Sequence, residues 1–152
     1  MGTDDNKAIV LRYWERCWNH QNPSAILETH HETFAQNGVP LGTAAFERSL
    51  AGFFQAFPDV HVSIEDVMAL DDRVLTRVVY YGTQTGPYEG LQPTGHRIRV
   101  TGLELFLLLD GRIIQHWHEM DHLAILRQIG EESEGAEMSP GGDCAFERRS
   151  DE

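Results

Sequence analysis

The chain contains 152 residues with a formal net charge of −12, and 41% of its residues are hydrophobic. This size and composition predict a single domain with its own hydrophobic core. The acidic balance argues against nucleic acid and anionic membrane surfaces as partners, because both need clustered Lys and Arg. Since neither a basic-then-apolar N-terminus nor an apolar run of about 18 residues is present, neither secretion nor membrane insertion is expected.

The cysteines and the C-terminal composition bear on the compartment and on the domain limits. Cys17 lies in a helical pattern and Cys144 lies near the C-terminus, which is no disulfide framework, so a reduced cytoplasmic location is expected. Residues 131–152 are rich in Glu, Ser and Gly and carry almost no large apolar side chain. We therefore predict a folded domain over residues 1–130 and a disordered acidic tail over residues 131–152.

The first half of the domain has the apolar spacing of helices. Apolar side chains recur every three or four residues over about 5–20, and the Asn-Pro-Ser cap at 22–24 can start a second, short helix through His30. The clearest helix begins at Thr43, which can cap it, and ends before Pro58. Its apolar face is formed by Phe46, Leu50, Phe53, Phe54 and Phe57.

After this proline the apolar period changes from 3.6 to 2, which indicates strands. Residues 60–65 alternate, and an Asp-Asp turn leads into a second strand over 73–83. A Gly- and Pro-rich loop over 85–95 precedes two more strands, which flank Asp110-Gly111, and a short helix covers about 121–129. Helices followed by a mostly antiparallel sheet predict an α+β domain with the helices on one face of the sheet.

The Asp110-Gly111 pair predicts a two-residue type I′ turn, which fixes the pairing of the strands on either side. With Leu109 opposite Arg112, Glu104 pairs with Trp117. The face predicted to carry Glu104 comprises Val100, Glu104, Phe106, Leu108, Ile113, Trp117, Glu119 and Asp121. The opposite face is predicted to carry His116, paired with Leu105, and His118, paired with Leu103.

Two carboxylates on this apolar face are the leading candidates for chemistry. Glu104 lies in mid-strand, where its alternative role is a buried ion pair with Arg77 or Arg99. Asp121 precedes the last helix, where its alternative role is an N-cap. Their Cα atoms are predicted to lie roughly 14 Å apart, on opposite sides of a bound molecule, with Glu119 between them.

Other chemical sites receive less support from the sequence. His116 and His118 suggest a metal site together with His30, His31 or His122, but the predicted register places them away from Glu104 and Asp121, so no metal is expected. The sequence has no Gly-rich phosphate loop, Ser nucleophile motif or Cys/His arrangement, and no cofactor is expected. Arg77 could steady an anionic oxygen or form an ion pair at the sheet edge.

Several segments, taken in order, resemble one known family. These are YWERCWN, FQAFPDVHVSIEDV, GTQTGPYEGLQPTGHRI and GLELFLLLDGRIIQHWHEMDHLAILRQIG, within Lys7–Gly130. The chain resembles the SnoaL-like polyketide cyclases of the nuclear transport factor 2-like fold group. The resemblance implies a cone-shaped α+β barrel, in which helices wrap a curved, mostly antiparallel sheet around a deep apolar pocket, and assembly as dimers or tetramers.

The resemblance also implies a reaction. In these cyclases an aspartate at the end of the last strand is the general acid/base of an intramolecular aldol closure, and Asp121 matches that position. A histidine on the preceding strand assists, but this chain carries Glu104 there. Asn37 and Gln84 likewise stand where many relatives carry histidine. These departures place the usual polycyclic substrate in question.

We therefore expect a cofactor-independent cyclase of a polyketide or related natural-product intermediate, with Asp121 and Glu104 as the catalytic pair. Alternatives on the same scaffold are epoxide opening, dehydration, isomerisation, and ligand binding without catalysis. The residues expected to bind the substrate are Trp14, Trp18, Asn37, Phe54, Arg77, Phe106, Trp117 and Glu119.

The opposite face of the predicted hairpin bears on assembly. Leu103, Leu105, Leu107 and Ile114 would line it, and helices can cover only one side of the sheet. A homodimer or homotetramer packed through this face is expected.

Overall fold

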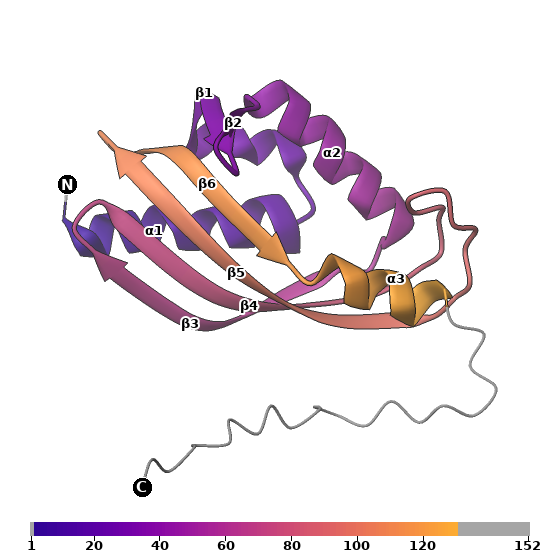
Figure 1. The fold of residues 1–152 in the computed structure, drawn as a ribbon. Coiled ribbons are helices and arrows are strands. Elements are labelled where there is room, and N and C mark those ends of the chain that lie inside the picture. Colours follow the sequence, from indigo (N-terminus) through magenta and orange to yellow (C-terminus); the bar gives the residue numbers. More distant parts are fainter. Residues whose placement is uncertain (1, 131–152) are drawn as a thin grey trace, which may run out of the picture.

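The computed structural model describes residues 2–130, so the tail predicted over 131–152 lies outside the described residues. Figure 1 shows a sheet of long strands with helices packed against it. The elements in chain order are α1 (Thr3–Tyr13), the π-helical η1 (Trp14–Asn19), the 3₁₀-helical η2 (Pro23–Glu28), β1 (His30–Gln36), β2 (Val39–Pro40), α2 (Thr43–Ala56), β3 (His61–Leu70), β4 (Arg73–Thr83), β5 (Arg97–Leu109), β6 (Arg112–Met120) and α3 (His122–Gly130).

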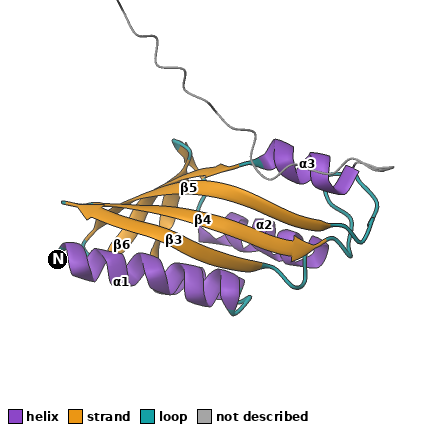
Figure 2. Cartoon of the chain, turned by 90° about the horizontal axis from the view of Figure 1, so that it is seen from below, coloured by secondary structure: helices purple, strands orange, loops and turns teal. Residues whose placement is uncertain are grey.

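The six strands form one open, mixed sheet in the order β2-β1-β6-β5-β4-β3. Only β1 and β6 run parallel, and the other neighbours are antiparallel. Figure 2 shows α1 and α2 on one side of the strands and α3 near the end of β5. This confirms the predicted α+β class with a curved sheet wrapped by N-terminal helices, although the sheet does not close into a barrel. None of the helices within residues 2–130 has the length and apolar content needed to cross a membrane.

The predicted elements are confirmed where the local pattern was strong, as in α2 and the four long strands β3 to β6. The predicted second, short helix is present as the 3₁₀-helical η2 from Pro23, but its extension through His30 is wrong, because η2 ends at Glu28 and His30 opens β1. In β1, His30 pairs with Ile113 of β6. A parallel partner that lies far away in sequence leaves no local signal, and it overrides helix propensity here.

The turn at Asp110-Gly111 has the conformation that the sequence predicts. Both residues have positive φ, +49° and +76°, as a type I′ turn requires. Leu109 pairs with Arg112 and Leu108 with Ile113, but Leu107 pairs with Gln115. Ile114 therefore has no partner on β5 and forms a β-bulge.

This bulge corrects the predicted register of the hairpin. Beyond Ile114 every pairing is displaced by one residue, so Glu104 faces His118 rather than Trp117, and Phe106 faces His116. A displacement of one residue turns each side chain to the other face of the sheet. His116 and His118 therefore share the inner face, which packs against α1 and α2, with Glu104. Trp117 and Glu119 lie on the outer face, paired with Leu105 and Leu103.

The inner face is packed with aromatic side chains, and the indole N–H groups of both tryptophans among them have partners. Trp14 is fully buried and donates from Nε1 to Oγ1 of Thr76 at 3.1 Å. Trp18 donates from Nε1 to the Tyr13 hydroxyl at 2.9 Å. The N-terminal helical segment is thus fixed over the middle of the sheet by apolar contact and by hydrogen bonds.

Deletions at the bulge test whether Ile114 is its extra residue. Without Ile114, Gln115 still pairs with Leu107, so residues 115–120 keep their partners and their faces. Deleting Ile114 and Gln115 together shifts the pairing by one residue, so Glu119 would face Glu104 in the core and His116 would leave it. We expect the free energy of unfolding, measured by chemical denaturation, to fall by more than about 4 kcal/mol in the double deletion and by much less in the single deletion. A single deletion as destabilising as the double deletion would contradict the bulge at Ile114.

Candidate active site

The carboxylate of Glu104 lies at the centre of the inner face and is 0% exposed. Tyr80 on β4 donates its hydroxyl to Oε1 at 2.5 Å. On β6, His116 Nε2 lies 2.7 Å from Oε2 and His118 Nδ1 lies 2.5 Å from Oε1. Three side chains from the two neighbouring strands therefore saturate this one buried carboxylate.

The protonation states follow from burial and from these contacts. Burial alone would raise the pKa of Glu104, but the charge of His118 and the hydrogen bonds from His116 and His118 outweigh it and lower that pKa to about 2. Burial would lower the pKa of His118, yet the Glu104 carboxylate raises it above its ordinary value of 6.5. Burial, together with the charge of Glu104, holds the pKa of Tyr80 well above 10.0, so Tyr80 is a neutral donor.

His118 also reaches a pocket of about 420 Å³ beside this network. Its side chain is 21% exposed, whereas Glu104 behind it is fully enclosed. The pocket lies between the N-terminal helical segment, α2, the 87–89 loop and the end of β6, and five of its fourteen lining residues are Tyr, Trp or Phe. The lining residues are Tyr13, Trp18, Gln36, Phe46, Ser49, Leu50, Gly52, Phe53, Pro87, Tyr88, Glu89, His118, Met120 and His122.

Asn37 holds the backbone of His118 in place. Its Oδ1 accepts from the His118 backbone N–H at 2.7 Å, and its Nδ2 donates to the His118 carbonyl at 3.3 Å. The φ of Asn37 is +53°, in the left-handed region that asparagine tolerates better than most residues. Asn37, predicted to touch the substrate, thus contacts the site through the strand that carries His118.

The predicted inner-face residues divide between the pocket and the core behind it. Trp18, predicted to bind the substrate, lines the pocket. Phe54 is half-buried against Trp18, with ring centroids 5.8 Å apart. Trp14 and Phe106 are fully buried and lie outside the lining of this pocket. They therefore support its aromatic wall from behind.

Four predicted site residues lie on the other side of the sheet. Asp121 caps α3, because its Oδ1 accepts the backbone N–H of Ala124 at 3.1 Å. Arg77 forms an exposed ion pair with Asp66 at 3.1 Å. Arg77, Glu119 and Asp121 line a separate hollow of about 400 Å³, and Trp117 shares their face. The structure therefore does not bring Asp121 together with Glu104, and the predicted common face for them is wrong.

Sequence reasoning missed His116, His118 and Tyr80 as neighbours of Glu104. The alternation in His116-Trp117-His118 is visible in the sequence, but its face depends on the bulge at Ile114, which no residue type announces. Glu104 itself was recognisable, because a carboxylate among apolar strand residues needs partners.

Nitrogen atoms of His116 and His118 and an oxygen of Glu104 lie within 4.8 Å of one another, a grouping that a metal ion could use. Each imidazole, however, contacts a different oxygen of Glu104, at hydrogen-bond distance. Within the described residues these side chains, together with Tyr80, are joined by hydrogen bonds. The absence of a metal from the site stays a prediction.

Comparison with known proteins agrees with this architecture. Residues 8–129 match the family model of the SnoaL-like polyketide cyclases. Nogalonic acid methyl ester cyclase of Streptomyces nogalater is 29% identical over 99 residues, which cover 63% of this chain and 72% of that protein.

Two solved structures extend the likeness to most of the domain. A protein of Jannaschia sp. CCS1 assigned to the SnoaL-like polyketide cyclases has a TM-score of 0.78 at 27% identity, with 86% of this chain and 95% of that chain covered. AclR of Streptomyces galilaeus, assigned as a hydroxylase, has a TM-score of 0.77 at 26% identity, with 85% and 83% covered. Because the family match spans nearly all of residues 2–130, the chain belongs to the SnoaL-like polyketide cyclase family.

Proposed function

We propose that the protein is a cofactor-independent cyclase in which His118 transfers protons and Glu104 orients it. The observation that carries this proposal is the pairing of a pocket-lining imidazole with a fully buried carboxylate. Because Nδ1 of His118 is held by Glu104, the other ring nitrogen, Nε2, is available to a bound molecule. A carboxylate that fixes the orientation and protonation of a histidine is a recurrent arrangement in acid/base catalysis.

The charge of Glu104 suits His118 to this task. General acid/base catalysis is most effective when the pKa of the catalytic group lies near the working pH. Glu104 raises the pKa of His118 above its ordinary value of 6.5, against the effect of burial. An imidazole whose Nδ1 is held by a carboxylate can accept a proton at its other ring nitrogen and return it.

A balanced ring closure can be written with these groups. Neutral His118 removes a proton from a carbon next to a carbonyl group, and the enolate carbon attacks a second carbonyl carbon of the same molecule. The oxygen of that second carbonyl takes the proton back from the imidazolium and becomes a hydroxyl group. One carbon–carbon bond forms, no electrons leave the substrate, and the pocket supplies proximity of the two reacting carbons.

In this protein the acid and the histidine stand on the opposite strands from those that the family resemblance implies. In the family's cyclases an aspartate on the last strand acts with a histidine on the preceding strand. Here the histidine, His118, is on the last strand, and the carboxylate, Glu104, is on β5. The catalytic role predicted for Asp121 passes to His118 in this proposal, because Asp121 caps α3 and lines the hollow on the outer face.

The pocket lining supports an aromatic or ring-forming substrate. Trp18, Phe46, Phe53 and Tyr88 contribute ring surfaces, and the volume of about 420 Å³ lies in the range of small-molecule sites. One curated relative is named for the methyl ester of nogalonic acid. We propose a polyketide intermediate of that chemical class as the substrate.

Turnover of variants at positions 118 and 121 separates the two candidate catalysts. His118→Gln should lower kcat on nogalonic acid methyl ester, or on the true substrate once found, by about 10²–10⁴-fold, as the loss of a general acid/base does. Asp121→Asn should keep turnover within a few-fold and change stability little, because the Oδ1 of asparagine caps a helix as well as that of aspartate does. Product formation would be followed by chromatography with mass spectrometry. If Asp121→Asn abolished turnover while His118→Gln retained it, His118 would not be the catalyst.

The pH dependence of kcat/KM tests the role of Glu104. Because the first step needs neutral His118, kcat/KM should rise as pH rises through an inflection above 6.5. Glu104→Gln removes the negative charge that raises the pKa of His118, so the inflection should move to lower pH and the maximum rate should fall. An inflection that stayed in place in Glu104→Gln would contradict the proposed pairing.

A wild-type protein that binds the candidate substrate without changing it would instead support ligand binding without catalysis.

We also propose that the protein self-associates through its outer sheet face. This face carries large apolar side chains that no helix of residues 2–130 covers fully: Met68, Leu70, Leu75, Leu103, Leu105, Leu107 and Trp117. A contiguous apolar surface of this kind favours association, and a second copy offers the same complementary face. A homodimer would bury the outer sheet face of both copies. A homotetramer would need a second interface elsewhere on the protein.

Light scattering coupled to size-exclusion chromatography tests the assembly. Leu103→Lys places a charge in the middle of the outer sheet face and should shift the protein toward monomer at micromolar concentration. Leu27→Lys is a matched control, because both leucines are 52% exposed but Leu27 lies in η2, away from this face. Wild-type protein that elutes as a clean monomer would contradict the assembly.

A further inference from the structure

We propose that His116 is a positioning residue for His118: it binds Glu104 from the core side as a neutral imidazole and keeps that carboxylate ionised and turned toward His118. The inference rests on the proposed function, since it concerns the same proton-transfer pair. Its test, however, needs no substrate.

A hydrogen bond and close ring packing hold His116 in place. His116 is 0% exposed, and its Nε2 lies 2.7 Å from Oε2 of Glu104. Its ring stacks on Phe106 with centroids 4.3 Å apart and meets the edge of Tyr13 at 5.4 Å. Rotation of the ring would break these contacts in a closely packed core. Glu104 is thus held on one oxygen by His116, while its other oxygen is left for Tyr80 and His118.

The second nitrogen of His116 identifies which atom carries the hydrogen. Nδ1 of His116 is buried and has no hydrogen-bond partner among the described residues. A doubly protonated ring would place an unsatisfied N–H donor there, which is unfavourable in the core. An ionised Glu104 can only accept hydrogen bonds. His116 must therefore donate from Nε2 and keep Nδ1 bare.

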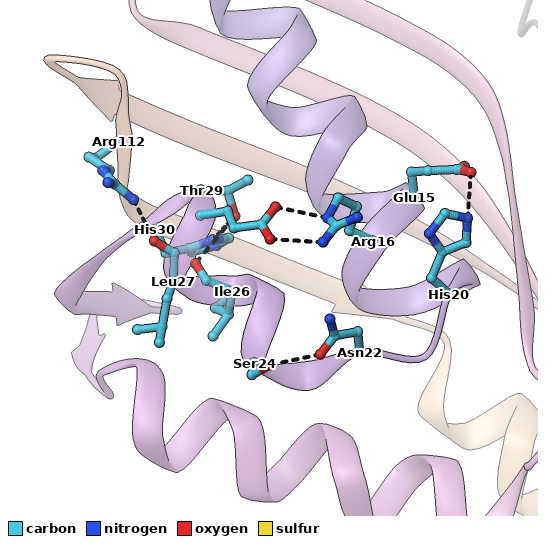
Figure 3. Close-up of polar contacts among 11 residues, drawn as sticks. Glu15, Arg16, His20, Asn22, Ser24, Ile26, Leu27, Thr29, His30 and Arg112 are labelled. Carbon is cyan, nitrogen blue, oxygen red and sulfur yellow. Dashed lines mark hydrogen bonds and ion pairs between the residues drawn. The ribbon is translucent and has the colours of Figure 1, made fainter.

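His30 makes protonation of His116 still less favourable. The ring centroids of His30 and His116 lie 5.7 Å apart in the core. Nε2 of His30 is also buried and has no hydrogen-bond partner among the described residues. Nδ1 of His30 contacts Oγ1 of Thr29 at 2.9 Å, as Figure 3 shows. Burial lowers the pKa of both histidines below 6.5, and the charge of His116 lowers that of His30 further. Two adjacent buried imidazoles cannot both become cations at moderate pH.

The titrating proton of the network therefore belongs to His118 alone. His116 cannot accept it, and Tyr80 does not release its own proton near neutral pH. His118 is the member of the network that reaches the pocket, so the proton sits where a substrate can receive it. The other titratable groups that face the network or share the pocket with His118 are Tyr13, His30, Tyr88, Glu89 and His122. The charge of Glu119, on the outer face, also raises the pKa of His118.

Nitrogen-15 NMR of the histidine rings in the full chain reads these states directly. In wild-type protein between pH 5 and 8, His116 should keep a protonated Nε2 and a bare Nδ1, while His118 titrates above 6.5. A wild-type His116 that is protonated on Nδ1 at neutral pH would overturn the proposal. This measurement stands even if no variant folds.

Three variants then test the positioning role. His116→Phe keeps the ring packing but removes the donor to Glu104, so the carboxylate holds the proton of His118 more tightly. The pKa of His118 should rise by roughly one unit. His116→Gln restores an N–H donor and should bring this pKa back toward the wild-type value. His30→Phe is the packing control, because it removes a buried imidazole that does not touch Glu104, and it should leave this pKa unchanged.

A merely structural role predicts a different result. If folded His116→Phe left the pKa of His118 unchanged or lowered it, His116 would contribute packing only and the proposal would fail. The pKa of His118 should rise in His116→Phe and fall in Glu104→Gln. Because these directions are opposite, a general effect of destabilisation cannot account for both. Failure of the cyclase proposal would instead show as absent turnover while these NMR results held.

Discussion

An ionised carboxylate with no exposed surface is stable in a protein only when donors surround it, and Glu104 imposes that condition on this fold. Its partners, Tyr80, His116 and His118, come from the strands on either side. The pairing of β4, β5 and β6 is therefore coupled to the chemistry of one side chain. Removing a donor would leave part of a buried charge uncompensated, whereas most polar substitutions on the surface would change little.

One unpaired residue brings these partners together. With Ile114 bulged out, His116 and His118 turn inward and Trp117 and Glu119 turn outward. The bulge thus gives the two faces of β6 different roles. The inner face carries the hydrogen-bonded network and the pocket, while the outer face carries apolar side chains and the Asp121 cap of α3. A β-bulge next to a functional site that re-aims a side chain is a recurrent device.

The sequence predicted elements whose signals are local, and it failed where distant contacts decide. Phe46, Leu50 and Phe53 mark α2 by their spacing, and Asp110-Gly111 marks the type I′ turn. The strand that begins at His30 depends on a parallel partner more than eighty residues away, and the bulge depends on how β6 meets both β1 and β5. Glu104 stood out because its chemistry conflicts with its neighbours, but its partners could not be named without the register. Asp121 fitted both a cap and a catalyst in sequence, and the structure gives it the capping hydrogen bond.

The register of the β5–β6 hairpin is the central claim, and cross-strand nuclear Overhauser effects in uniformly labelled protein measure it most directly. The account predicts backbone and side-chain contacts between Glu104 and His118 and between Phe106 and His116. Contacts between Glu104 and Trp117 and between Phe106 and Gln115 are those of a hairpin without the bulge. Their observation would place both histidines on the outer face and contradict the proposed site.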